Sequence, residues 1–320
     1  GKDWSHLLDS FKDQKINFGN AIAEKTWKKD YLPVCEMAVD VMAAKNPPTS
    51  PKDLIDICLK DWAAGSRARE IRARSLSQFL THAVNREGIA DIWTPPNDLK
   101  EHIGRAKKGE QINQKGDPFS DDQQILDFLK TLPIDSPFKK DADAATRWNN
   151  AFCLMAELGL RPTEVNQLIV KKDPTTKDFY WFCTYAKKGG GGTTEPRRIE
   201  PLPLLDRDGK EIQWNLIDRF RANLLPLPDR VDGDACKVYL QRREGWKQLK
   251  EMMKKKEGAN LVPYSFRHYY SLRGHIAGID SGSMASSMGH SIEAHHRAYP
   301  YSSKASTTNA FKQARERITA

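Results

Sequence analysis

The sequence predicts a mainly α-helical protein with a small antiparallel β-sheet, divided into a helical domain and a mixed α+β domain. Three observations lead to this prediction. Apolar residues recur at helical spacing over much of residues 25–108. A polar, glycine-bearing stretch, KKGEQINQKGDPFS (107–120), has no apolar periodicity and has the composition of a linker. Further along, an aromatic-rich segment followed by a glycine run predicts a two-stranded hairpin.

Residues 1–108 form the predicted helical domain, in which helices are expected from about residue 25 onward. The segment 26–45 places apolar residues on one helical face: Leu32, Val34, Val39 and Met42. Prolines then break the chain, and Ser50-Pro51 is typical of an N-cap followed by proline in the first turn, which predicts a helix to residue 64. A longer helix is expected over 66–86, and a short one ends at residue 108.

The predicted helix 66–86 is basic in its first half and apolar in its second. Its basic residues are Arg67, Arg69, Arg72 and Arg74. Such a helix can lie against a DNA backbone or in the major groove, although this helix taken alone is more typical of a solvated charged face. The formal net charge of +9 favours a polyanionic partner such as nucleic acid. The four arginines are therefore candidate DNA-binding residues.

A linker is predicted at 109–119 and the second domain at 120–320. Helices are expected over 120–132 and 142–158 and again after Trp214. Between them, KDFYWFCTYAKK (177–188) predicts one strand, GGGGTTEPRR (189–198) a hairpin tip and IEPLPL (199–204) a second strand. No Gly-Lys-Ser/Thr follows the glycine run, so it does not predict a phosphate-binding loop.

The stretch MGHSIEAHHRAYPY (288–301) gathers three histidines and two tyrosines. A zinc site is not predicted, because the adjacent His295 and His296 point about 100° apart on a helix and no cysteine or HExxH pattern accompanies them. The five scattered cysteines lack zinc-site spacing and are interpreted as core residues of a reducing compartment. No apolar run is long enough to span a bilayer and no secretory signal is apparent, so we expect a cytoplasmic, nucleoid-associated protein.

Three short motifs in order carry the functional signal. They are Gly159-Leu160-Arg161 with Glu164, then Tyr264-Ser265-Phe266-Arg267, then Met288-Gly289-His290-Ser291 with Tyr299 nine residues after the histidine. Two lysines, Lys187 and Lys188, precede the predicted hairpin tip. With these motifs the chain resembles a tyrosine recombinase of the phage-integrase class. The resemblance extends from about residue 120 to the C-terminus, and the preceding region fits the family's helical core-binding domain by pattern.

The resemblance implies a role for each motif residue. Arg161 and Arg267 would hold the non-bridging oxygens of a DNA phosphate, which two guanidinium forks do well because they stay charged and bind bidentately. His290 would add a third donor, and Glu164 would orient Arg161. Tyr299 would attack phosphorus, with Tyr301 as a less well-spaced rival. Lys187, or alternatively Lys188, would protonate the leaving oxygen. Tyr264 stands where the family commonly has histidine; it can donate a hydrogen bond but cannot carry imidazolium charge.

The implied function is site-specific strand exchange through a 3′-phosphotyrosine, in the integration or excision of a mobile element. Neither a metal, ATP nor another cofactor is expected. The partners would be double-stranded DNA and further copies of the chain, a monomer when free and a homo-tetramer on DNA. Arg197 and Arg198 are further candidate phosphate contacts, and a helix at 310–318 could dock on a neighbouring protomer or on its own domain. A type IB topoisomerase and a non-catalytic DNA-binding relic remain as alternatives.

Overall fold

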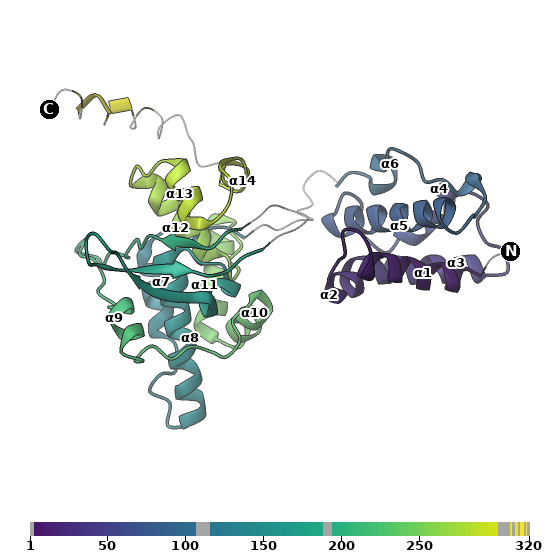
Figure 1. Ribbon diagram of the computed structural model, residues 1–320. Helices are drawn as coiled ribbons and strands as arrows, with labels where there is room; N and C mark the ends of the chain where they lie inside the picture. Colours follow the sequence, from purple (N-terminus) through teal and green to yellow (C-terminus); the bar gives the residue numbers. More distant parts are fainter. Residues whose placement is uncertain are drawn as a thin grey trace. The chain divides into compact units, whose positions relative to one another are not determined.

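The computed structural model describes residues 3–106, 116–187 and 194–299, together with a few positions between 308 and 318 (Figure 1). Lys188, Tyr301 and part of the predicted helix 310–318 lie outside the described residues. The chain divides into two compact units, Gly1–Gln114 (unit 1) and Lys115–Ala320 (unit 2). None of the described helices combines the length and the apolar character that a membrane crossing requires.

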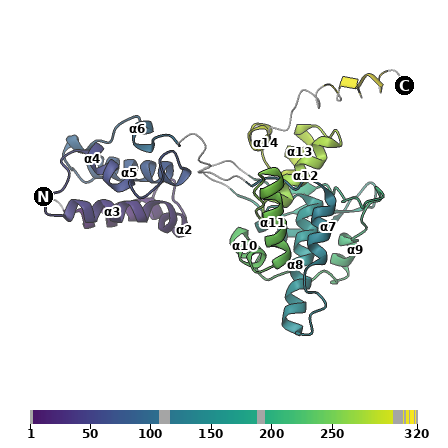
Figure 2. The ribbon, with the colours of Figure 1, turned by 180° about the vertical axis from the view of Figure 1, so that it is seen from behind.

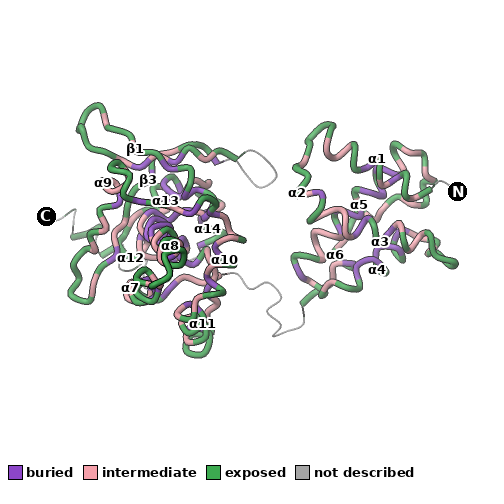
Figure 3. The backbone as a smooth tube through the Cα atoms, turned by 90° about the horizontal axis from the view of Figure 1, so that it is seen from below, coloured by how far each residue is buried: buried purple, intermediate pink, exposed green. Residues whose placement is uncertain are grey.

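Unit 1 consists of helices around an apolar core. Its elements are α1 (Trp4–Asn17), α2 (Glu24–Thr26), the π-helical turn η1 (Trp27–Tyr31), α3 (Leu32–Ala43), α4 (Pro51–Leu59), α5 (Arg67–Asn85), the 3₁₀ turn η2 (Asp91–Trp93) and α6 (Lys100–Ile103). Buried residues of α1, α3, α4 and α5 form the core (Figure 3). The side chains of Ser50 and Ser66 accept hydrogen bonds from the backbone N–H groups of Asp53 and Arg69, so the predicted N-cap at Ser50 is confirmed and Ser66 is a second N-cap.

The helices of unit 1 differ from the expected ones at four places. Helix α6 ends at Ile103 rather than at residue 108. Helix α1 precedes the first predicted helix, and only two of its residues, Leu7 and Phe11, are buried, so its apolar periodicity is weak. The single helix predicted over 26–45 is divided into α2, η1 and α3. Pro33 causes this division, because it lacks the N–H that a continuous α-helix would use. Helix α4 ends at Leu59 rather than at residue 64.

Unit 2 combines helices with a three-stranded antiparallel sheet, so the predicted fold class is confirmed. Its elements are α7 (Asp122–Lys130), α8 (Lys139–Leu158), the 3₁₀ turn η3 (Pro162–Gln167), β1 (Leu168–Lys172), β2 (Phe179–Cys183), β3 (Arg197–Ile199), α9 (Leu216–Arg221), α10 (Gly233–Gln241), α11 (Glu244–Glu257), α12 (Ser265–Ile276), α13 (Ser281–Met288) and α14 (Ile292–Ala298). The strand order is β1-β2-β3. Helices α7, α8 and α11 lie behind the sheet in Figure 1 and in front of it in Figure 2.

The sheet contains one strand more than the sequence predicts. Strand β1 is the additional one; its sequence LIVKK alternates poorly and only Leu168 is buried. It pairs with the predicted aromatic strand, with Leu168 opposite Cys183. The predicted second strand, 199–204, is misplaced: β3 begins at Arg197, within the predicted hairpin tip, and ends at Ile199. It does not continue to residue 204 because Pro201 and Pro203 cannot donate to a strand ladder. The glycines of the predicted hairpin tip lie outside the described residues.

The contact between α8 and α12 positions the motif residues. Gly159 caps α8 in the left-handed conformation, with φ +62°. A Cβ at this position would lie 2.3 Å from the Tyr270 ring on α12, so only glycine lets the chain turn here against that helix. The turn brings Arg161 beside the first turn of α12, where Arg267 lies.

Candidate active site

A buried carboxylate, Glu164 in η3, lies at the centre of the candidate site. Its side chain has no exposed surface, and three guanidiniums surround it. Nη1 of Arg161 lies 2.7 Å from Oε1, Nη2 of Arg197 lies 3.0 Å from Oε1, and Nη1 of Arg267 lies 3.6 Å from Oε2. Burial alone would raise the pKa of Glu164, but Arg267, Arg197 and Arg161 outweigh it and hold the pKa below its ordinary value. The ionised carboxylate therefore gathers three positive charges and leaves the cluster electropositive.

Arg161 reaches this carboxylate through both its backbone and its side chain. It is the N-cap residue of η3, and Pro162 occupies the first position of that turn. The Arg161 backbone N–H donates to Oε2 of Glu164 at 2.9 Å, and its Nη2 donates to the Gly289 carbonyl at 3.0 Å. These hydrogen bonds hold the Arg161 side chain in place, and 20% of its surface is still exposed to solvent.

Arg267, on α12, is almost fully buried and is held by two backbone carbonyls. Its Nη1 donates to the Gly159 carbonyl at 2.7 Å and its Nη2 to the Met288 carbonyl at 2.6 Å. Burial lowers the pKa of the Arg267 guanidinium.

The turn at Gly289 explains the glycine of the Met-Gly-His motif. Gly289 caps α13 in the left-handed conformation, with φ +69° and ψ +57°. A Cβ there would lie 2.4 Å from Cζ of Arg197, whose Nε donates to the Ser287 carbonyl at 2.7 Å. Glycine is therefore required both by the backbone angle and by the guanidinium packed against it. Arg197, expected at a DNA phosphate, has a side chain only 10% exposed that supports the cluster from inside.

Gly289→Ala should destabilise the folded chain more than the same substitution at a glycine that has a similar backbone angle but no close neighbour. Gly258 is the matched control, because it caps α11 at φ +65° and a Cβ added there would meet nothing within 4 Å. Both alanine variants lose about 1–2 kcal/mol to the left-handed residue, whereas Gly289→Ala must also displace Arg197. Denaturant unfolding of both variants measures the difference. Equal losses of stability would show that the Arg197 contact is unimportant.

Tyr299 and His290 lie together next to the arginine cluster, in the same chain. The Tyr299 side chain is buried, with 6% exposed, and its backbone N–H donates to the His295 carbonyl at 2.8 Å. Its ring centroid lies 5.9 Å from that of His290 and 5.5 Å from that of His268. Burial first, and then the positive charge of Arg267, lower the pKa of His268 to about 4. The phenol thus lies among neutral imidazoles beside buried positive charge.

A cavity of about 350 Å³ opens beside these groups. Its lining includes Arg161, Lys187, Tyr264 and His290. Lys187 pairs with Thr194 through two backbone hydrogen bonds of 2.9 Å, which hold the lysine at the end of the hairpin. Burial raises the pKa of Tyr264, so its hydroxyl stays protonated and can donate into the cavity.

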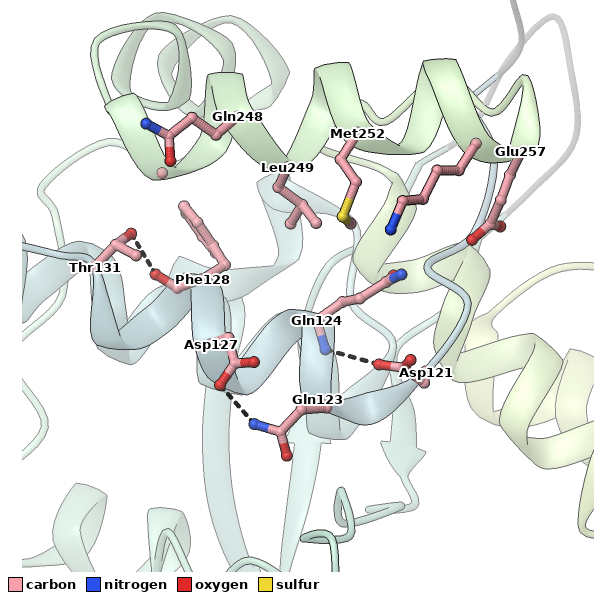
Figure 4. Close-up of a pocket in the computed structure, with 12 residues that line it drawn as sticks. Asp121, Gln123, Gln124, Asp127, Phe128, Thr131, Gln248, Leu249, Met252 and Glu257 are labelled. Carbon is pink, nitrogen blue, oxygen red and sulfur yellow. Dashed lines mark hydrogen bonds between the residues drawn. The ribbon is translucent and has the colours of Figure 1, made fainter.

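A larger groove lies between α7 and α11 (Figure 4). Its volume is about 600 Å³, and its lining consists of side chains such as Gln124, Phe128, Leu249 and Met252. Among the residues that the structure describes, no guanidinium and none of the motif residues line this groove. We therefore assign the candidate site to the smaller cavity, where the charged groups converge.

The candidate DNA-binding arginines of unit 1 divide into two kinds. Arg69 donates to the carbonyls of His102 and Trp62, at 2.8 and 2.9 Å, and so fastens α6 and the end of α4 to α5. Arg72 is 13% exposed and lies 3.6 Å from Asp30. Arg67 and Arg74 are exposed and both contact Glu70, each at 2.7 Å. Two of the four are thus used within the fold, and two face solvent.

The strand pattern distinguishes the two arginines of β3. Arg198 is 49% exposed and contacts Asp173 and Glu200, whereas Arg197 points inward, on the same face as the buried Ile199. Side chains of adjacent residues in a strand point to opposite faces of the sheet. A strand predicted from residue 197 onward would therefore have placed Arg197 and Arg198 on opposite faces. No sequence pattern indicates that His295 and His275 belong to a bonded chain with His290, because that chain joins three separate helical segments.

Comparisons with known proteins show that the fold is similar to that of solved integrase and site-specific recombinase structures. The Tn1549 transposon integrase in complex with circular intermediate DNA is similar at a TM-score of 0.56 and 13% identity, over 97% of this chain and 99% of that one. The same integrase with transposon right end DNA gives 0.54 and 13%, over 100% of both chains. XerH site-specific recombinase, in a post-cleavage complex with a palindromic difH substrate, gives 0.54 and 13%, over 92% of this chain and 80% of that one. No family model matches the chain, and no curated protein matches its sequence.

Proposed function

We propose that the chain is a site-specific recombinase that cleaves and rejoins DNA through a 3′-phosphotyrosine. The observation that carries the proposal is the convergence of Arg161 and Arg267 on Glu164, with the Tyr299 ring packed near His290 at the same site. Arg161, Tyr264 and His290 line the cavity, whereas Arg267 and Tyr299 do not line it and are buried. The DNA-bound state of the similar integrase and XerH structures, and the net charge of +9, support DNA as the substrate.

In the proposed reaction, a DNA phosphate enters the cavity and its non-bridging oxygens meet the arginine edges. The Tyr299 oxygen bonds to phosphorus as the bond to the 5′ oxygen breaks, so the DNA remains attached through its 3′ phosphate. Negative charge builds on the non-bridging oxygens, and the guanidiniums are already fixed to meet it because Glu164 and three backbone carbonyls hold them.

The departing 5′ oxygen needs a proton, which we assign to a lysine at the hairpin. Lys187 lines the cavity together with Tyr264 and His290, and it is our first choice, with Lys188 as the alternative. Attack by a 5′ hydroxyl of a second strand reverses these steps and exchanges the strands. Exchange between two DNA sites would use four protomers, and we propose the tetramer on that ground.

A nicked DNA substrate tests the proposal. It is taken from the boundaries of the element that encodes the chain, with the nick near the cleavage site, so that the cleaved end diffuses away and the adduct is trapped. We expect a covalent protein–DNA product, detected as a denaturation-resistant band. Binding without an adduct would identify a non-catalytic DNA-binding protein. Relaxation of a supercoiled plasmid that lacks these sites, without strand exchange, would identify a topoisomerase.

A further inference from the structure

Three histidines from three parts of unit 2 form a hydrogen-bonded chain. His290 Nε2 lies 2.8 Å from His295 Nδ1, and His295 Nε2 lies 2.8 Å from His275 Nε2. His290 follows the cap of α13, His295 lies on α14, and His275 lies in the last turn of α12. The proposed reaction has a role for His290 only, and leaves the other two unexplained.

The chain leads from the cavity toward the protein surface. His290 lines the cavity, the middle ring of His295 is fully buried, and His275 is partly exposed next to Ile276, which is 74% exposed. A buried polar ring normally needs partners for its nitrogens. His295 has two, one toward the cavity and one toward the surface.

Both ring nitrogens of His295 are hydrogen-bonded to another imidazole. The nitrogen of His295 that carries the proton therefore determines which nitrogen carries the proton in His290 and in His275. A neutral imidazole donates through one nitrogen and accepts through the other. In one arrangement His290 donates to His295, which donates to His275, and His290 then presents an accepting Nδ1. In the other arrangement all bonds are reversed and His290 presents a donating Nδ1–H. The two arrangements differ by one proton moved along the chain.

The surroundings keep the rings neutral, as such a chain requires. Burial first, and then the positive charge of Arg267, lower the pKa of His290 to about 3. Burial and then His275 lower the pKa of His295 to about 4, and burial and then His296 lower that of His275. The charged or titratable groups facing these rings, besides the rings themselves, are Arg267, Arg161, Arg197, His296 and Tyr299. The three arginines and His296 disfavour a further positive charge.

A shared metal ion is a poorer explanation of the cluster. His295 turns its two nitrogens toward different neighbours, so the three rings form a line and do not converge on one centre. In the described part of the chain, no group of three His, Cys, Asp or Glu side chains is arranged to hold a metal ion.

We propose that His290, His295 and His275 form a proton relay between the active-site cavity and the surface; this inference rests on the proposed function. As Tyr299 bonds to phosphorus, its hydroxyl proton passes to Nδ1 of His290. The Nε2 proton of His290 moves to His295, the Nε2 proton of His295 moves to His275, and His275 releases its other proton outward. Rejoining returns a proton by the same route. Tyr264 makes such a relay useful, since a phenol in the place of an imidazole is a poor proton acceptor.

His275→Phe tests the relay, because phenylalanine keeps a ring at the outer end but has no nitrogen. His296→Phe is the matched control, a change of the same kind at an exposed histidine beside His295. Thermal unfolding first checks that both variants fold. Single-turnover cleavage of the nicked DNA is then measured across pH with and without added imidazole, and nitrogen-15 spectra report the tautomer of His290.

We expect His275→Phe to cleave DNA on the order of tenfold more slowly than the wild type. This loss is smaller than the full rate enhancement of a positioned acid or base, because His290 is still present. Imidazole should restore the rate, and the His290 tautomer ratio should change; His296→Phe should alter neither. Normal cleavage by His275→Phe, or slow cleavage with no rescue and an unchanged tautomer, would overturn the relay. If the wild-type chain forms no adduct, the proposed function fails, and an unchanged His290 tautomer in His275→Phe would then still rule out the coupled chain.

Discussion

Tyr299→Phe should abolish the covalent protein–DNA product while leaving DNA binding intact. Phenylalanine fills the same space among His268, His290 and His295, so the site keeps its shape and loses only the nucleophilic oxygen. No other nucleophile in this reaction can replace the tyrosine oxygen in the adduct, because attack by water at phosphorus leaves no bond between DNA and protein. The nicked-substrate assay measures the adduct, and a gel-shift titration on the same DNA measures binding.

Tyr301→Phe is the control, since Tyr301 is the rival nucleophile two residues on. This variant should form adduct at the wild-type level. The assignment is wrong if Tyr301→Phe loses the adduct and Tyr299→Phe keeps it. Loss in both variants would instead indicate that the segment is sensitive to any change, and peptide mapping of the wild-type adduct would then identify the linked residue.

The sequence predicted those features that depend on local pattern. Helical periodicity, the N-cap at Ser50, and an aromatic strand before a glycine run were sufficient for the fold class. The motif residues could be named because their spacing is itself the signal. Glu164 was expected only to orient Arg161, and its contacts with Arg197 and Arg267 needed coordinates.

The remaining features depend on contacts between distant residues, which one sequence does not show. Arg197 was a candidate phosphate contact like Arg198, yet the close approach of Gly289 and the bond to Glu164 make it part of the cluster. Arg69 likewise looked free for DNA, but it binds backbone carbonyls of its own unit. In both cases a guanidinium bonds to a group far along the chain, and helical or strand periodicity carries no information about that group.

Glu164→Gln should cause the largest loss of stability of any conservative change at the site. The amide keeps the size of the side chain but removes the negative charge that three buried or half-buried guanidiniums share. Removing one partner of a buried ion pair typically costs about 3–5 kcal/mol, because charge is left uncompensated. Glu200→Gln is the control, since Glu200 is 58% exposed and pairs with Arg198; an exposed pair contributes about 0–1 kcal/mol. Denaturant unfolding at neutral pH compares both variants with the wild type.

The pH dependence of the same measurement separates charge from shape. The three guanidiniums hold the folded-state pKa of Glu164 below its ordinary value of 4.5. The stabilisation by the carboxylate is therefore fully present above pH 4.5 and is lost as the pH falls through the lower, folded-state pKa. The stability gap between wild type and Glu164→Gln should stay constant from neutral pH down to about pH 5 and narrow below it. Other carboxylates titrate in both proteins and cancel in the difference. A gap that persists unchanged in acid would mean that hydrogen-bond geometry, and not the gathered charge, makes Glu164 important.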